Sequence, residues 1–74
     1  MAAAQEGELL GPDDFVATLP MGLGDYRSGR EELAAFDLDP ATCEIRVDEN
    51  GRLIISQDGK MRTMLSNQHW RRAT

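Results

Sequence analysis

Hydrophobic and polar residues alternate strictly from Cys43 to Asp48, in the second half of the chain. Cys43, Ile45 and Val47 alternate with charged residues, and this period of two is typical of a strand with one buried face. Two further apolar runs follow, each after a short sequence in which Asn or Asp precedes Gly and a cation. The pattern therefore predicts a three-stranded antiparallel β-meander, with strands at roughly 43–48, 52–57 and 60–65.

The length of each turn decides which residues share a face of this sheet. A two-residue turn at Asn50-Gly51 would split the apolar side chains between both faces, whereas a three-residue turn over 49–51 gathers them on one. A three-residue turn over 57–59 has the same effect in the second hairpin. We therefore expect two inner rows, which are Val47-Leu53-Thr63 and Ile45-Ile55-Met61.

A first short helix is predicted near the start of the chain. Pro12 suits a first helical position, and the two following Asp residues favour the positive end of a helix. Phe15, Val16 and Leu19 then fall on one side of a helix of about two turns. Pro20 is expected to end it.

A second helix is predicted from Gly29 to about Asp37. Ser28 and Glu31 have the spacing of a capping box, in which each side chain bonds the backbone N–H of the other residue. Asp39-Pro40 is expected to stop this helix, because a residue before Pro avoids the helical region. The side chains expected to pack the helices on one sheet face are Phe15, Leu19, Leu33 and Phe36.

The chain is expected to fold as one small α+β domain: two short N-terminal helices, the meander, and a short C-terminal segment. Its 74 residues leave room for one core, which we place in 11–74, after a flexible leader over 1–10. The Gly-containing stretch 20–29 lacks the preceding strand, glycine spacing and Lys-Ser/Thr pair of a phosphate-binding loop. We interpret that stretch as a connector.

Charge is distributed unevenly along the chain, whose net charge is −5. Residues 1–42 hold nine acids and two bases, which gives −7, whereas residues 43–74 hold four acids and six bases, which gives +2. Two interpretations remain open: a solvated acidic face, or a bipolar molecule with an acidic surface for a basic partner and a cationic surface opposite.

Few residues offer catalytic or metal-binding chemistry. The single Cys and single His, Cys43 and His69, do not have the spacing of a metal site, and no nucleophile–base pattern is apparent. We therefore expect a protein that is not an enzyme and uses no cofactor. One cysteine, a start without a secretory charge pattern and no apolar run long enough for a bilayer together predict a cytoplasmic protein.

The outer face of the predicted meander mixes cations with apolar residues, as interfaces do. Its expected rows are Arg46-Ile54-Arg62, Glu44-Ser56-Lys60 and Asp48-Arg52-Met64. Either this face binds a partner, or the leader or C-terminal segment covers it. Trp70 likewise either packs on the core or anchors a contact beside two arginines. The candidate partner-binding residues are Arg46, Arg52, Ile54, Lys60, Arg62, Trp70, Arg71 and Arg72.

These features predict a non-enzymatic interaction protein that docks on a larger macromolecular complex. Small acidic inhibitors and adaptors of the kind that phages and mobile elements encode fit this class. The contact would use the outer sheet face or the acidic helices. One alternative is a nucleic-acid-binding regulator that uses the sheet cations with Arg71 and Arg72, although the net negative charge opposes it. Another is a homodimer or assembly subunit that buries the outer face.

Overall fold

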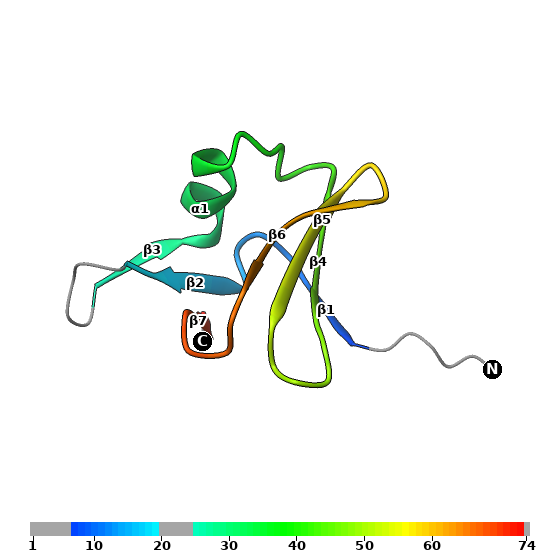
Figure 1. Cartoon of the computed structure of the whole chain (residues 1–74). Helices are drawn as coiled ribbons and strands as arrows, with labels where there is room; N and C mark the ends of the chain where they lie inside the picture. The colour runs from blue at the N-terminus through cyan, green and yellow to red at the C-terminus, as the bar shows by residue number, and fades with distance from the viewer. Residues whose placement is uncertain (1–6, 20–24, 74) are drawn as a thin grey trace.

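The computed structural model describes residues 7–19 and 25–73 and shows a mostly β architecture (Figure 1). In the described residues, seven strands form two antiparallel sheets, and there is one short helix, α1 (Gly29–Ala35). The strands are β1 (Glu8–Leu10), β2 (Phe15–Thr18), β3 (Tyr26–Ser28), β4 (Cys43–Val47), β5 (Leu53–Gln57), β6 (Lys60–Leu65) and β7 (Trp70–Arg72). The predicted α+β fold, with two helices beside a three-stranded meander, is therefore wrong.

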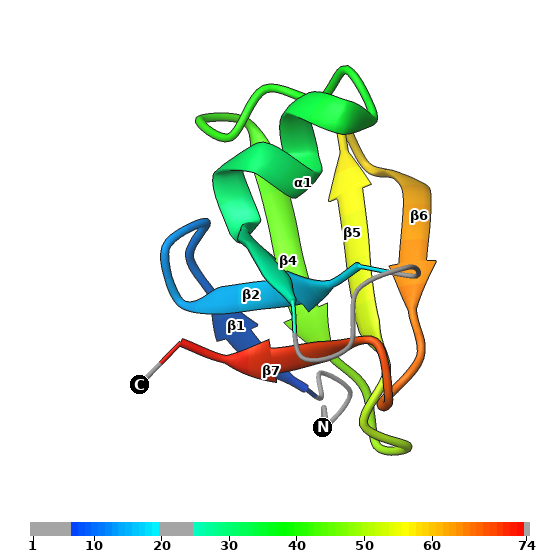
Figure 2. The same ribbon diagram turned by 90° about the vertical axis from the view of Figure 1, so that its left-hand side faces the viewer.

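The two sheets lie against each other and enclose one core. The four-stranded sheet has the order β1-β4-β5-β6, and the three-stranded sheet has the order β3-β2-β7. Strands β2 and β7 run across β4 and β5 on one face of the four-stranded sheet, and α1 lies over the upper part of that face (Figure 2). The buried core consists of Phe15, Leu33, Leu38, Ile45, Val47, Leu53, Ile55 and Trp70. We call the other face of the four-stranded sheet, over which no described element lies, the outer face (Figure 1).

The first predicted helix is a turn followed by strand β2. Asp14 closes the turn, since its backbone N–H donates to the Gly11 carbonyl oxygen at 3.1 Å and its Oδ2 accepts from the Gly11 N–H at 2.7 Å. Pro12 and Asp13 suit such a turn as well as they suit a helix start, which is why the local signal misled. From Phe15 onwards buried and half-buried residues alternate, and β3 and β7 pair with the two edges of β2. Pro20, the expected helix stop, lies outside the described residues.

The predicted capping box is confirmed at the start of α1. Ser28 Oγ accepts from the Glu31 backbone N–H, and Glu31 Oε1 accepts from the Ser28 backbone N–H, both at 3.1 Å. The helix ends earlier than expected, because Asp37 adopts a left-handed conformation with φ of 63°. The Leu38 N–H then bonds the Leu33 carbonyl, which closes a Schellman motif.

Because of this helix end, Phe36 does not pack on the core as expected. The Schellman motif turns Leu38 back onto Leu33, and both side chains are buried. Phe36, which was expected in the core, instead faces outwards and is 43% exposed. The early helix stop therefore decides which of two neighbouring apolar residues the core receives.

The first hairpin of the meander forms as predicted. Strand β4 pairs with β5 so that Val47 lies opposite Leu53 and Ile45 opposite Ile55. The Asp48 N–H donates to the Arg52 carbonyl oxygen at 2.9 Å, which closes the three-residue turn. Gly51 has a φ of 81°, the left-handed conformation that this turn requires and that glycine adopts most readily.

The second hairpin has a different register from the predicted one. Asp58 and Gly59 both have positive φ, 56° and 79°, as in a two-residue type I′ turn, so Gln57 pairs with Lys60 and Ser56 with Met61. A β-bulge at Arg62 then shifts the register, and Ile55 pairs with Thr63. Met61, expected on the inner face opposite Ile55, is therefore exposed, and Thr63 lies opposite Ile55 instead. The half-buried Leu65 lies opposite Leu53, where Thr63 was expected, and packs on the core.

Part of the predicted leader belongs to the fold. Residues 8–10 form strand β1, which pairs with β4 and places Leu10 opposite Ile45. Leu10 packs against the core, whereas its neighbour Leu9 faces the other way and is exposed. Residues 1–6, the remainder of the leader apart from Gly7, lie outside the described residues.

Gly29 allows α1 to approach the start of β2 closely, so a side chain at this position should destabilise the fold. A Cβ at Gly29 would lie 2.3 Å from the Pro12 carbonyl oxygen and 2.6 Å from Phe15 Cε1. We expect Gly29→Ala to lower the free energy of unfolding, measured with urea, by about 1–3 kcal/mol, the usual cost of overpacking.

Gly11→Ala is the matched control for this measurement. Its Cβ would meet only the Asp14 carboxylate, at 3.1 Å from Oδ2, and a shift of a few tenths of an ångström relieves this contact while Oδ2 still accepts from the Gly11 N–H. Its free energy of unfolding should change by less than about 0.5 kcal/mol. Equal stability of Gly29→Ala and wild type would contradict the close packing of α1 on β2.

Candidate interaction surface

A continuous row of side chains crosses all four strands on the outer face. Pairing across the sheet places Leu9 beside Arg46, Arg46 beside Ile54, and Ile54 beside Met64. In the neighbouring row Glu44, Ser56 and Met61 lie side by side. Leu9, Met61 and Met64 are 61%, 59% and 44% exposed. We call the set Leu9, Ile54, Met61 and Met64 the apolar patch.

The two arginines of this face are each held by a carboxylate of the same sheet region. Arg46 forms an ion pair with Glu44, two residues away on β4. Arg52 Nε donates to Asp48 Oδ2 at 2.9 Å across the first turn. The outer face therefore combines exposed apolar side chains with charges that are already balanced locally.

Lys60 and Arg62 lie on β6, an edge strand of the four-stranded sheet. Both are exposed, and within the described part of the chain neither forms an ion pair. The changed register pairs Lys60 with Gln57, on the side opposite Ser56, so Lys60 is not in the outer row where it was expected. Arg62 is the extra residue of the bulge. Bulges and cations on an edge strand oppose pairing with another sheet edge.

Trp70 lies in the core rather than on a contact surface. It is 8% exposed, and its indole Nε1–H donates to the Gly51 carbonyl oxygen at 2.9 Å. The sequence left open whether Trp70 packs on the core or anchors a contact, and the structure shows that it packs on the core.

Arg71 and Arg72 follow Trp70 on β7, in the three-stranded sheet, and lie on the other side of the molecule from the outer face (Figure 1). The Arg71 guanidinium lies over the Tyr26 ring, 5.9 Å from its centroid, and Arg72 bonds Glu8 at 2.7 Å. The structure thus brings Arg46, Arg52 and Ile54 together but separates them from these two arginines.

Two residues of the apolar patch were missed in the sequence. Leu9 sits in a three-residue strand, which is too short to show a period, and Met61 was assigned to the core by the wrong turn length. That Leu9 is exposed while Leu10 packs on the core could not be predicted without the partner strand β4. The predicted row Arg46-Ile54-Arg62 is wrong in its last member, because the bulge replaces Arg62 with Met64. Strand β1 extends the face at its edge and does not cover Ile54 or Met64.

The described residues contain little that points to metal or thiol chemistry. Within 7–19 and 25–73, no group of three or more His, Cys, Asp or Glu residues could hold a metal ion. Cys43 is half-buried against the core, and burial raises the pKa of its thiol, with the Asp39 charge adding to the effect. In the part of the chain that the structure describes, no helix is long and apolar enough to cross a membrane.

Comparison of the chain with protein-family models, with curated proteins and with solved structures finds no match.

Asp48 accepts several hydrogen bonds in the turn of the first hairpin, and these make the stability of the fold depend on pH. Its carboxylate accepts from the Arg52 backbone N–H at 2.8 Å, from the Arg52 side chain and from the Asn50 backbone N–H at 2.9 Å. These hydrogen bonds, led by the one from the Arg52 backbone, lower the pKa of Asp48 from its ordinary value. Asp48 therefore stabilises the fold above its unfolded pKa of about 3.9, and this contribution is lost as pH falls through the lower folded pKa.

We expect Asp48→Asn to lose less stability than wild type when urea unfolding is compared at about pH 5 and about pH 2. The amide cannot titrate, so its contribution is the same at both values. Glu49→Gln, which removes a carboxylate from the same turn but none of the hydrogen bonds that Asp48 accepts, is the matched control. An equal acid dependence of Asp48→Asn and wild type would show that a lowered pKa of Asp48 does not contribute to the stability of the folded chain.

Proposed function

We propose that the chain is a non-enzymatic interaction protein that docks on a larger protein through the outer face of its four-stranded sheet. The observation that carries this proposal is the apolar patch, in which three large side chains are 44–61% exposed on one uncovered face. A small domain gains stability by burying such side chains. Leaving them together on one face is typical of a surface that a partner covers.

The local balance of charge indicates what kind of partner surface fits. Arg46 and Arg52 are paired with Glu44 and Asp48, so a partner need not supply carboxylates to neutralise them. An apolar protein surface with hydrogen-bonding groups at its rim suits this arrangement. Acidic groups on the partner would be favoured only near Lys60 and Arg62, at the edge strand.

The side chains of the patch suit a contact that forms on a rigid support. Leu9, Ile54 and Met64 project from three different strands, so the backbone beneath them is hydrogen-bonded on the sheet. Met61 and Met64 have flexible, polarisable side chains that can adapt to an irregular apolar surface. A small inhibitor or adaptor that docks without folding on its partner fits this combination.

Nucleic-acid binding is less well supported by the geometry. Phosphate contacts need cations that are free to release counterions, and Arg46 and Arg52 are held by carboxylates. Trp70 is buried and so does not offer a ring for base stacking from this position. The cations that this alternative requires are distributed over opposite sides of the molecule.

The double variant Met61→Gln with Met64→Gln tests the proposal. It keeps side-chain size and adds no charge, but it removes half of the apolar patch. Wild-type and variant chains are used as bait in lysate of the native host, and each captured protein is quantified by mass spectrometry. We expect the specific partner to be recovered at least about tenfold less with the double variant, because central apolar residues dominate such contacts.

Tyr26→Gln is the matched control. Tyr26 is 41% exposed but lies on β3, in the other sheet, so this variant should recover the partner as wild type does. Equal losses with both variants, or none with either, would contradict docking through the outer face. The remaining alternative is a homodimer, which sedimentation of the purified chain tests. If wild type is a dimer and the double variant is a monomer, the outer face binds a second copy of the chain, and docking on a different protein is contradicted.

A further inference from the structure

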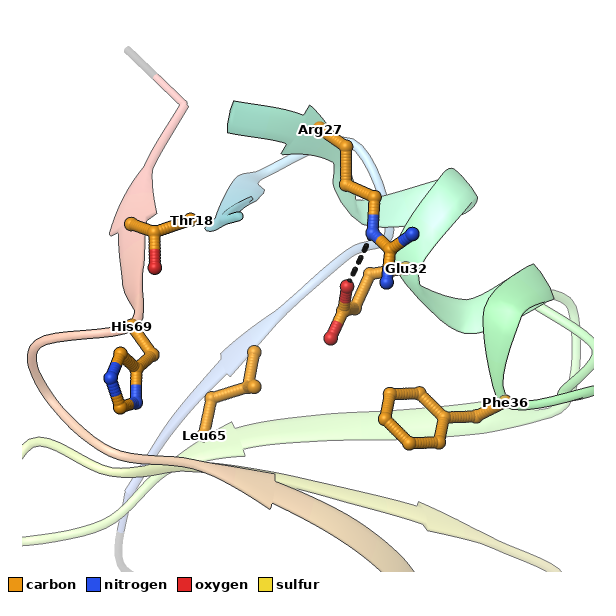
Figure 3. A pocket seen from close by; sticks show the side chains of 6 residues that line it. All are labelled: Thr18, Arg27, Glu32, Phe36, Leu65 and His69. Carbon is orange, nitrogen blue, oxygen red and sulfur yellow. Dashed lines mark hydrogen bonds and ion pairs between the residues drawn. The ribbon is translucent and has the colours of Figure 1, made fainter. Parts of the chain in front are cut away.

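A pocket of about 300 Å³ opens on the other side of the four-stranded sheet, away from the outer face. It lies between α1, the β2 and β3 strands, and the segment from β6 to β7 (Figure 3). Its volume is at the lower end of the range for small-molecule sites and suits one inserted side chain. The described residues that line it are Thr18, Arg27, Glu32, Phe36, Leu65 and His69.

The Glu32 carboxylate is a buried charge with one oxygen open to the pocket. Its Oε1 accepts from Arg27 Nε at 2.7 Å, and in the described part of the chain Oε2 has no hydrogen-bond donor. Figure 3 shows the carboxylate pointing into the space that the Phe36 ring and Leu65 border. A carboxylate has room for several donors, and a buried one gains most from each that reaches it. The open oxygen therefore favours a ligand group with N–H donors.

Arg27 does not make an equal demand for an anion. Its side chain is 36% exposed, so its remaining N–H groups reach water, whereas the Glu32 side chain is only 7% exposed. Within the described residues no fully buried side-chain oxygen or nitrogen lacks a partner, so water reaches Glu32 Oε2 through the pocket, and a ligand donor would replace that water.

The walls and the surrounding charge agree with a cationic ligand. Phe36, 43% exposed, presents a ring at the pocket on which a planar cation can stack, and Leu65 offers an apolar surface for the stem of a long side chain. The segments that form this side, residues 11–19, 25–42 and 70–73, hold seven acids against four bases, Arg71 and Arg72 included. The field on this side of the molecule therefore attracts cations.

We propose that this pocket receives an arginine side chain of a basic partner protein. The guanidinium donates to Glu32 Oε2 and stacks on Phe36, while its methylene stem lies against Leu65. This contact is separate from the outer face and does not depend on the function proposed above.

Peptide titration of the ¹⁵N-labelled chain, followed by NMR, tests the proposal directly. The probe is acetyl-Gly-Arg-Gly-amide, and the matched probes carry citrulline, which has the same shape without the charge, or Glu in place of Arg. We expect saturable shifts at the backbone amides of Thr18, Leu65 and His69. Citrulline should bind at least about tenfold more weakly, as for loss of a charged hydrogen bond. The Glu peptide should give no saturable shifts.

Three variants separate the pocket from a general effect of charge. Glu32→Gln should weaken binding of the Arg peptide, whereas Asp37→Asn, which removes the same charge from an exposed site with a left-handed backbone, should not. Phe36→Leu alters only an exposed ring and should also weaken binding, which keeps the test valid if Glu32→Gln unfolds. The Met61→Gln and Met64→Gln double variant should bind as wild type.

Several outcomes would overturn the proposal. Tighter binding of the Glu peptide would show that Arg27 recognises an anion. Equal weakening by Asp37→Asn and Glu32→Gln would show diffuse attraction to an acidic surface. The absence of saturable shifts at millimolar Arg peptide would show that the pocket does not take this side chain. None of these results depends on whether the outer face binds a partner.

Discussion

The burial of Trp70 joins parts of this fold that are far apart in the sequence. Its ring fills the core, its indole N–H bonds the Gly51 carbonyl oxygen in the first hairpin turn, and its strand pairs with β2. The four-stranded sheet, the three-stranded sheet and a turn of the meander therefore meet at one side chain. Without the ring the core would contain a large cavity, and the Gly51 carbonyl would lose its donor.

This packing uses nearly all of the described elements on one side of the four-stranded sheet. A chain of 74 residues has little material with which to bury apolar surface. Helix α1 and the three-stranded sheet both cover the inner face (Figure 1). The outer face is therefore left with Leu9, Ile54, Met61 and Met64. The same packing leaves the pocket around Glu32 on the covered side. The two candidate contact sites thus face opposite ways and differ in chemistry, one apolar and the other acidic.

Sequence reasoning succeeded where one local geometry had no good competitor. The Ser28–Glu31 capping box satisfies two backbone donors within four residues, so it needs no help from the rest of the chain. The first hairpin had a single register that placed Ile45, Val47, Leu53 and Ile55 on one face. The sequence-based prediction was wrong at Phe15–Thr18, because the residues that favour a turn also favour a helix start. It was also wrong at the second hairpin, where a two-residue turn is followed by a bulge that returns apolar residues of β6 to the inner face.

The sequence by itself determined the local elements that close their own hydrogen bonds: the capped helix and the three strands of the meander. Only the tertiary structure decided that residues 8–10, 15–18 and 70–72 become strands, since each is too short to be stable without the backbone groups of a distant partner. It also decided the candidate sites. The apolar patch exists because β1 adds Leu9 to the sheet edge, the two-residue turn places Met61 on the outer face, and the bulge places Met64 there. The pocket exists because α1 brings Glu32 next to Arg27 of β3 and Leu65 of β6.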